Sequence, residues 1–100
     1  MTMAQKVVNQ KNLLVIKMTW AEYVAASDTW GWCDLCQQTD FQDKFGYYIA
    51  GIDRWYCEMC YKAWYDSVLP RTIDVIPERE NYNKMMNKLK QIGTWDDTAL

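Results

Sequence analysis

The chain has 100 residues, half of them hydrophobic, and its 11 basic and 13 acidic side chains leave a formal net charge of −2. That length predicts one small domain, and the charge argues against a non-specific DNA-binding protein, which needs an excess of lysine and arginine. No stretch reaches the roughly 18 apolar residues of a membrane-spanning helix, and the polar residues 1–12 do not resemble a signal peptide. We therefore expect a cytoplasmic protein without a membrane partner.

The first quarter of the chain predicts a strand followed by a short helix. Residues 1–12 are expected to form a polar arm, and the apolar run Leu13–Lys17, rich in β-branched residues, predicts a strand. Thr19 and Glu22 match the capping box, in which an N-cap threonine and a glutamate three residues later bond to each other's backbone N–H groups. The box predicts a helix that continues to about Ala26.

Two identical cysteine pairs occupy the middle of the chain. Cys33-x-x-Cys36 and Cys57-x-x-Cys60 are separated by 20 residues, and the sequence contains no other cysteine and no histidine. The two-residue spacing lets one tight turn direct both sulfurs at one metal ion, and two such turns complete a tetrahedron. We predict a single structural Zn²⁺ ion whose ligands are Cys33, Cys36, Cys57 and Cys60.

Two alternatives remain for these cysteines. A rubredoxin-type iron site has similar spacing, but its turns usually place glycine after the second cysteine, where this chain has Gln37 and Tyr61. A disulfide-forming C-x-x-C motif usually lies on a thioredoxin-like βαβ unit, which the sequence does not predict.

The residues around the second pair predict a hairpin and a helix. Residues 46–50 and 54–57 have the composition of strands, and 51–53 that of a turn. No glycine or proline interrupts residues 58–69, where an apolar face recurs with helical spacing. Its members are Tyr61, Trp64, Tyr65 and Val68. The second cysteine pair is therefore expected to open this helix.

The order of cysteine turn, hairpin, and second cysteine turn at a helix start resembles the treble-clef zinc finger over residues 30–69. The matching motifs are Cys33-Asp34-Leu35-Cys36 and Cys57-Glu58-Met59-Cys60. The resemblance implies metal binding but no single activity, because treble clefs serve in ribosomal proteins, nucleases, ubiquitin machinery and adaptors. Nuclease members of the class use histidines, which this chain lacks.

The last third of the chain predicts a strand and an amphipathic helix. Residues 72–76 alternate around Ile73 and Val75, which predicts a strand, and Pro77 suits the first turn of a helix over 78–92. Gly93 is expected to terminate that helix and 94–100 to form a tail. The apolar stripe comprises Tyr82, Met85, Met86, Leu89 and Ile92. The expected fold class is α+β, one zinc-stabilised domain over 1–100 with a zinc-binding unit (30–69), a short N-terminal helix, and a strand and C-terminal helix (70–93).

The function indicated is binding rather than catalysis. Without histidine, and with the cysteines committed to a metal, the chain lacks the usual acid–base and nucleophilic groups, so neither enzyme activity nor a small-molecule substrate is expected. Residues 33–60 carry five acidic and two basic side chains together with several aromatic rings. Such a surface suits a protein partner with a basic surface, for example a nuclease. The candidate contact residues are Asp40, Phe41, Asp43, Phe45, Tyr48, Asp53 and Trp55.

In size, charge and architecture the chain is similar to small accessory proteins of phages and mobile elements, among them anti-CRISPR proteins. That resemblance implies an inhibitor that blocks nucleic-acid access to a host nuclease in the host cytoplasm. Two alternatives have different partners. One is a nucleic-acid-binding zinc-finger regulator that uses the basic residues of the last helix. The other is a structural subunit of a larger assembly. The basic residues are Arg79, Lys84, Lys88 and Lys90.

Overall fold

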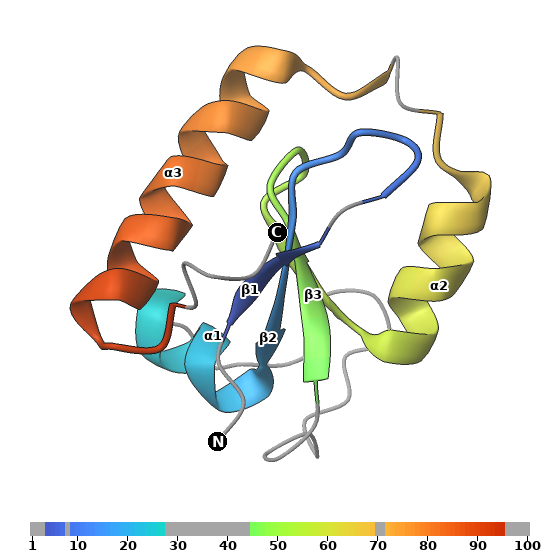
Figure 1. The fold of residues 1–100 in the computed structure, drawn as a ribbon. Coiled ribbons are helices and arrows are strands. Elements are labelled where there is room, and N and C mark those ends of the chain that lie inside the picture. The colour runs from blue at the N-terminus through green and yellow to red at the C-terminus, as the bar shows by residue number, and fades with distance from the viewer. Residues whose placement is uncertain (1–3, 8, 28–44, 70–71, 96–100) are drawn as a thin grey trace.

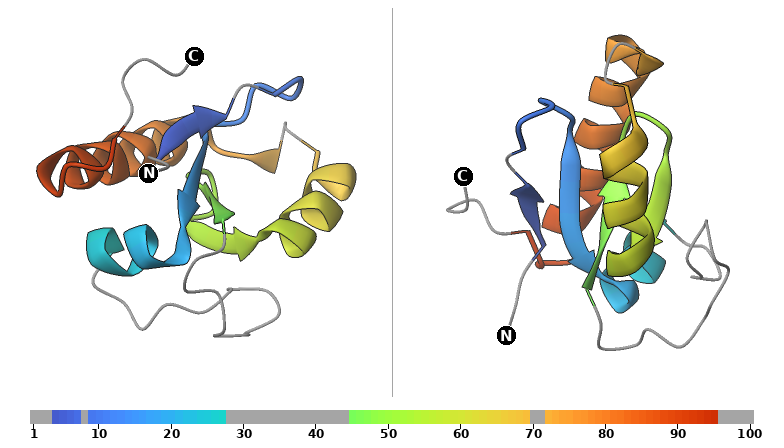
Figure 2. Two further views of the ribbon diagram at one scale, coloured as in Figure 1. Left: turned by 60° about the horizontal axis from the view of Figure 1, so that its bottom comes forward. Right: turned by 90° about the vertical axis from the view of Figure 1, so that its right-hand side faces the viewer.

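A four-stranded antiparallel sheet with the strand order β1-β2-β3-β4 forms the centre of the protein. The computed structural model describes residues 4–7, 9–27, 45–69 and 72–95. Helices α1 and α3 lie on one side of the sheet and α2 on the other (Figures 1 and 2). The elements are β1 (Gln5–Val7), β2 (Val15–Thr19), α1 (Trp20–Ser27), β3 (Phe45–Ile49), β4 (Arg54–Cys57), α2 (Glu58–Ser67) and α3 (Val75–Gln91). Helices and an antiparallel sheet are the α+β class that the sequence predicts.

The side of the sheet that faces α1 and α3 carries the core. Ile16, Tyr48 and Trp55 are directly paired across β2, β3 and β4, and all three are buried. Because paired residues point to the same side of a sheet, they form one row. Tyr23 of α1 stacks on the Trp55 ring with 5.9 Å between the ring centroids. The hairpin that precedes the second cysteine pair is thus anchored in the core.

The opposite side of the sheet packs against α2. The Tyr47 ring of β3 stacks on Tyr61 of α2 at a centroid distance of 4.1 Å. Tyr56 of β4 meets Trp64 edge-on at 6.2 Å. The helical face predicted from the aromatic spacing is therefore confirmed as the face that meets the sheet.

The capping box at the start of α1 is also confirmed. The Glu22 backbone N–H donates to Thr19 Oγ1 (3.1 Å), and the Thr19 N–H donates to Glu22 Oε1 (2.8 Å). The second carboxylate oxygen of Glu22 accepts a bond from the Ala4 N–H at 3.1 Å. Glu22, which is buried, therefore connects the start of α1 to the chain entering β1.

Removal of this cap should cost a measurable part of the stability. We expect Thr19→Ala to lower the free energy of unfolding by about 1–2 kcal/mol, as N-cap threonine deletions do. Urea denaturation followed by circular dichroism measures the change. Thr72→Ala is the matched control, because its exposed hydroxyl donates to Leu69 O (2.7 Å) outside α1, α2 and α3. Equal losses for the two variants would contradict a capping role.

Two segments differ from their predicted structure. Within the expected polar arm, Gln5–Val7 pair antiparallel with Val15–Lys17 and add a fourth strand to the sheet. The strand predicted over 72–76 is wrong, because α3 already begins at Val75. Its N-cap is Asp74, whose carboxylate accepts a bond from the Ile76 N–H at 3.2 Å. The alternating residues Ile73 and Val75 therefore lie on either side of a helix N-cap and not in a strand. Ile76, in the first turn of that helix, is 69% exposed.

The C-terminal end of α3 follows the prediction. The buried residues Met85 and Leu89 lie on its predicted apolar stripe. Gly93 adopts φ +81°, the left-handed conformation that commonly ends helices at glycine. Beyond it, Trp95 packs edge-on against Tyr82 at 6.3 Å. Among the described helices, none combines the length and hydrophobicity that crossing a membrane would require.

Candidate metal centre

The second cysteine pair lies where β4 passes into α2. Cys57 is the last residue of β4 and the N-cap of α2, with extended backbone angles (φ −64°, ψ 166°). Cys60 is the third residue of the helix. The side chain of an N-cap residue points toward the backbone of this third residue. The turn therefore places both thiols at the same end of α2, as the predicted turn of a treble clef requires.

The surroundings of this pair favour thiolate ligands. Unpaired N–H groups and the positive end of the helix dipole stabilise negative charge at a helix N-terminus. The Cys57 side chain makes no capping hydrogen bond to the first turn of α2, so that turn does not occupy its sulfur. Cys57 is buried and Cys60 is half-buried. This shielding from water suits a closed structural site rather than an open catalytic one.

Only half of the predicted ligand set falls within the described residues. Cys33 and Cys36 lie outside them, as do the candidate contact residues Asp40, Phe41 and Asp43. In the described part of the chain, no three histidine, cysteine, aspartate or glutamate side chains gather as a metal site would need. Cys57 and Cys60 fit two of the four positions of a tetrathiolate site, and the ion itself stays a prediction.

The hairpin turn before the pair is held by Tyr48 and Asp53. The Tyr48 hydroxyl donates to Asp53 Oδ1 at 2.5 Å. Asp53 has φ +54°, a conformation that aspartate tolerates better than most residues. Burial, followed by the bond to Asp53, raises the pKa of Tyr48 well above its usual value. Asp53 therefore has a structural role in the turn in addition to its predicted surface role.

The burial of two candidate contact residues corrects the predicted binding surface. Tyr48 is 2% exposed and Trp55 0%, so both pack the core and present no surface to a partner. The prediction placed these two rings on the binding surface, whereas strand alternation turns them inward. Phe45 is half-buried, and the Lys17 Nζ lies 4.9 Å from its ring centroid. Among the described candidates, Phe45 and Asp53 remain accessible.

Met59 is an exposed residue that the sequence prediction overlooked. It lies between Cys57 and Cys60 and is 82% exposed. It also falls outside the helical stripe of Tyr61, Trp64, Tyr65 and Val68, so the spacing of that stripe could have identified it as a surface residue. A large, exposed apolar side chain is a suitable anchor for a partner.

The far end of α2 is fixed by a lysine from the β1–β2 connection. Lys11 Nζ donates to the backbone carbonyls of Tyr65 and Val68, the latter at 3.1 Å. Nζ also lies 4.6 Å from the Tyr65 ring centroid. A cation at a helix C-terminus satisfies carbonyls that lack a partner within the helix. Both ends of α2 are thus positioned by contacts outside the helix.

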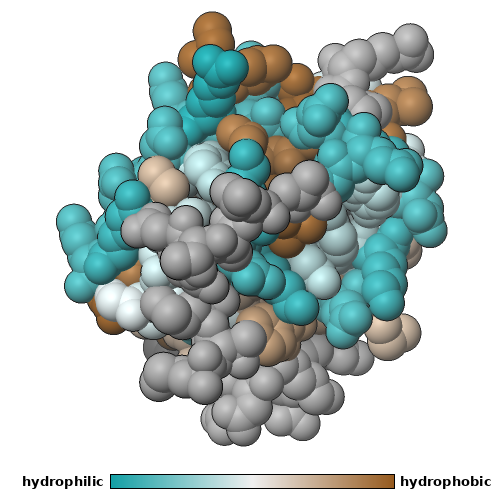
Figure 3. Space-filling model, viewed as in Figure 1, coloured by the Kyte–Doolittle hydropathy of each residue, from teal (hydrophilic) through white to brown (hydrophobic). Residues whose placement is uncertain are grey.

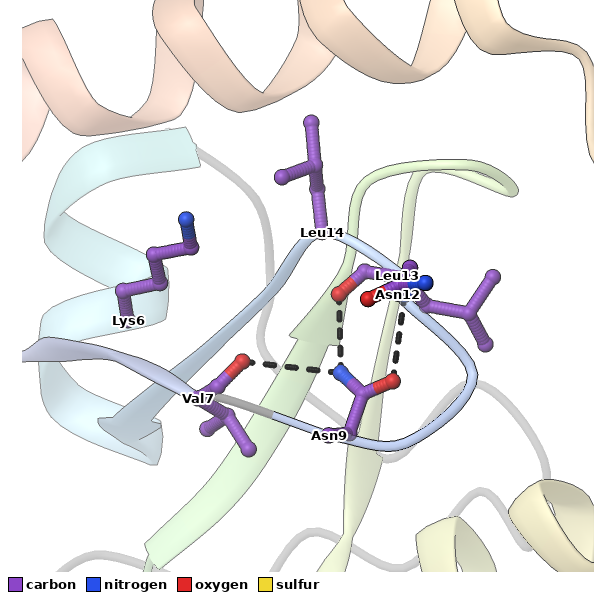
Figure 4. A pocket seen from close by; sticks show the side chains of 6 residues that line it. All are labelled: Lys6, Val7, Asn9, Asn12, Leu13 and Leu14. Carbon is purple, nitrogen blue, oxygen red and sulfur yellow. Dashed lines mark hydrogen bonds between the residues drawn. The ribbon is translucent and has the colours of Figure 1, made fainter. Parts of the chain in front are cut away.

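The β1–β2 connection is itself stiffened by Asn9. Its amide donates to Leu13 O at 2.8 Å, and its Oδ1 accepts a bond from the Leu13 N–H at 3.1 Å (Figure 4). A small hollow in this turn is lined by Lys6, Val7, Asn9, Asn12, Leu13 and Leu14. Asn9, one of the polar side chains that line it, is engaged in hydrogen bonds within the turn, so we assign the hollow a structural role.

The tyrosine cluster between the sheet and α2 makes stability sensitive to alkali. Burial, with smaller effects from Tyr65 and Tyr47, raises the pKa of Tyr61 to about 12 from its ordinary value of 10.0. The folded state disfavours the tyrosinate form of Tyr61. The stability that neutral Tyr61 contributes is therefore fully present below pH 10 and is lost as the pH rises to about 12. We expect the free energy of unfolding to fall over this range and to fall less steeply in Tyr61→Phe. Denaturation curves at several pH values measure both slopes, and identical slopes would contradict the prediction.

Comparison with known proteins identifies no relative. No protein-family model, curated protein or solved structure matches the chain.

Proposed function

We propose that this protein is a non-enzymatic, zinc-stabilised binding protein whose partner is another protein. The observation that carries the proposal is the position of Cys57 and Cys60, at the N-cap and third residue of a helix that directly follows a hairpin. With Cys33 and Cys36 as the other ligands, protein sulfurs would fill all four positions. Such an ion supplies folding energy and activates no water.

A protein partner is supported by the character of the segment that would hold the ion. Residues 33–60 carry three more acidic than basic side chains, and four thiolates around Zn²⁺ would add two further negative charges. Acidic surfaces steer toward basic ones. Met59 adds an exposed apolar anchor inside this segment. A nuclease with a basic nucleic-acid groove is a partner of this kind, and occupation of the groove would inhibit it without chemistry.

Two measurements test the proposal. Elemental analysis of the native protein should return about one zinc per chain, as one four-cysteine site requires. Affinity capture should then compare Met59→Glu with Ile92→Glu, which places the same charge on another exposed apolar residue, 44% accessible and at the C-terminal end of α3. We expect Met59→Glu alone to lose the captured protein while both variants keep their zinc.

Three outcomes would overturn the proposal. Native protein without a stoichiometric metal ion would show that zinc does not stabilise the protein. Equal capture by the wild-type and Met59→Glu proteins would show that the turn between Cys57 and Cys60 does not belong to the binding surface. Turnover of a small substrate by the purified chain would contradict the non-enzymatic assignment.

A further inference from the structure

The outer side of α3 carries a polar ridge with a cation on each flank. At 3.6 residues per turn, Asn83 and Asn87 lie opposite the buried positions Met85 and Leu89, and both asparagines are exposed. By the same spacing, Arg79 lies on one flank of this ridge, and Lys84 and Lys88 lie on the other. Figure 3 shows hydrophilic side chains along the side of the molecule where α3 runs.

The cations of this face are not neutralised by neighbouring carboxylates. Within the part of the chain that the structure describes, no carboxylate lies within ion-pairing distance of Arg79, Lys84 or Lys88, and the ion pair found there joins Glu58 to Lys62 at 3.4 Å. Glu78 is buried and accepts a bond from the Leu14 N–H at 3.1 Å. Glu80 is the exposed acid on α3. The α3 face therefore has a local positive charge although the chain is acidic.

An apolar residue continues the ridge at the start of the helix. Ile76 lies seven residues before Asn83, which is about two helical turns, and it is 69% exposed. Figure 3 shows hydrophobic atoms where α3 begins. The tertiary contacts of α3 leave this side chain in water, so the fold gives no reason for an isoleucine there.

We propose that the ridge of Ile76, Asn83 and Asn87 enters the major groove of duplex DNA. That groove admits an α-helix, and asparagine can bond bidentately to the N6 and N7 positions of adenine. Isoleucine can contact the thymine methyl group, as other apolar side chains do. Cations on both flanks match the two phosphate backbones that border the groove. RNA duplexes are disfavoured, because their major groove is too narrow for side chains to read.

This surface is separate from the metal-binding turn and goes beyond the proposed protein partner. Helix α2, which carries Glu58 and Asp66, lies on the other side of the sheet from α3 (Figures 1 and 2). The zinc-loaded protein could bind DNA through α3 even if it captures no protein partner. It could equally capture a protein partner and bind no DNA. The two ideas can therefore fail independently.

Fluorescence anisotropy of the zinc-loaded protein with a labelled DNA duplex of about 20 base pairs tests the proposal. If the three cations each contact one phosphate, the logarithm of the binding constant should fall with the logarithm of the salt concentration with a slope of about −2.7. This salt slope corresponds to roughly a 40-fold loss of affinity from about 50 to about 200 mM salt. We expect Arg79→Gln/Lys84→Gln/Lys88→Gln to weaken binding roughly tenfold per cation and to flatten the slope. The matched control, Lys6→Gln/Arg54→Gln/Lys62→Gln, removes the same charge from exposed residues outside α3 and should bind like the wild type.

Two further variants separate groove reading from general anion binding. Glu80→Gln should tighten binding. Asn83→Ala/Asn87→Ala should lose about tenfold in affinity for a duplex selected from a random pool while its salt slope is unchanged. Absence of binding at about 50 mM salt, equal losses in the two triple variants, or equal binding to polyglutamate would overturn the proposal. Equal binding to an RNA duplex would overturn its geometry.

Discussion

Replacement of Cys57 by serine is expected to abolish both zinc binding and the cooperative fold. Structural zinc contributes about 10–16 kcal/mol of apparent binding free energy in small zinc fingers, which matches or exceeds the roughly 5–15 kcal/mol of stability typical of a domain. Cys57 also ends β4, next to the Trp55 side chain in the core. Loss of this ligand should therefore disturb the hairpin as well as the ion.

Elemental analysis, near-ultraviolet circular dichroism and thermal melting measure this effect. The expected Cys57→Ser protein has less than one zinc per chain, a weakened aromatic signal and no cooperative transition. Met59→Ser is the matched control, because it removes a side chain from the same turn but one that is 82% exposed. Retention of the native spectrum and melting temperature by Cys57→Ser would show that the metal does not stabilise the fold.

The elements that the sequence predicts well are those whose signals are local. The capping box identifies the start of α1 because the two bonds that define it join Thr19 and Glu22, which are three residues apart. The aromatic spacing identified the buried face of α2, since Tyr61 and Trp64 both meet rings of the sheet. The positions of Cys57 and Cys60 at a helix start followed from the same spacing.

The elements that the sequence prediction misses depend on distant partners. β1 is short and carries Gln5 and Lys6, and it becomes a strand because β2 offers an edge and because the Ala4 N–H reaches the carbonyl of Thr94 (2.8 Å). The alternation of Ile73 and Val75 predicts a strand at the start of α3. Nothing in that alternation reveals that Asp74, three residues before Pro77, caps a helix.

The candidate site shows the same limit. Tyr48 and Trp55 have the composition of an aromatic binding surface, and only the pairing of β2, β3 and β4 shows that they share a buried row with Ile16. The same pairing connects the turn between Cys57 and Cys60 to the core. Cys57 is paired with Gly46, and the Trp55 indole lies directly over that glycine. The second cysteine pair is therefore fixed to the core through one close backbone contact.

Gly46→Ala tests this contact and should be the most destabilising of the glycine-to-alanine changes at positions 46, 51 and 93, the glycines that the structure describes. A Cβ at position 46 would lie 2.2 Å from Trp55 Cζ2 and 2.6 Å from the carbonyl oxygen of Tyr56. Trp55 is completely buried and stacked on Tyr23, so its ring cannot move aside without displacing the core. We expect a loss of about 3 kcal/mol or more, the upper end of the cost of overpacking. Because Gly46 is paired with Cys57, zinc affinity should fall in parallel.

The same substitution at two other glycines provides graded controls. At Gly51, the new Cβ would lie 2.4 Å from Ile73 Cγ2, a branch methyl of a half-buried side chain. Because Ile73 is less enclosed than the fully buried Trp55, it can shift more easily, so a smaller loss is expected. At Gly93 nothing lies within 4 Å, and only the positive φ opposes alanine, which predicts a cost of about 1 kcal/mol. Urea denaturation followed by tryptophan fluorescence, with a zinc-chelation midpoint for each variant, measures both effects. A loss at position 46 no larger than that at position 93 would show that Trp55 does not pack against Gly46.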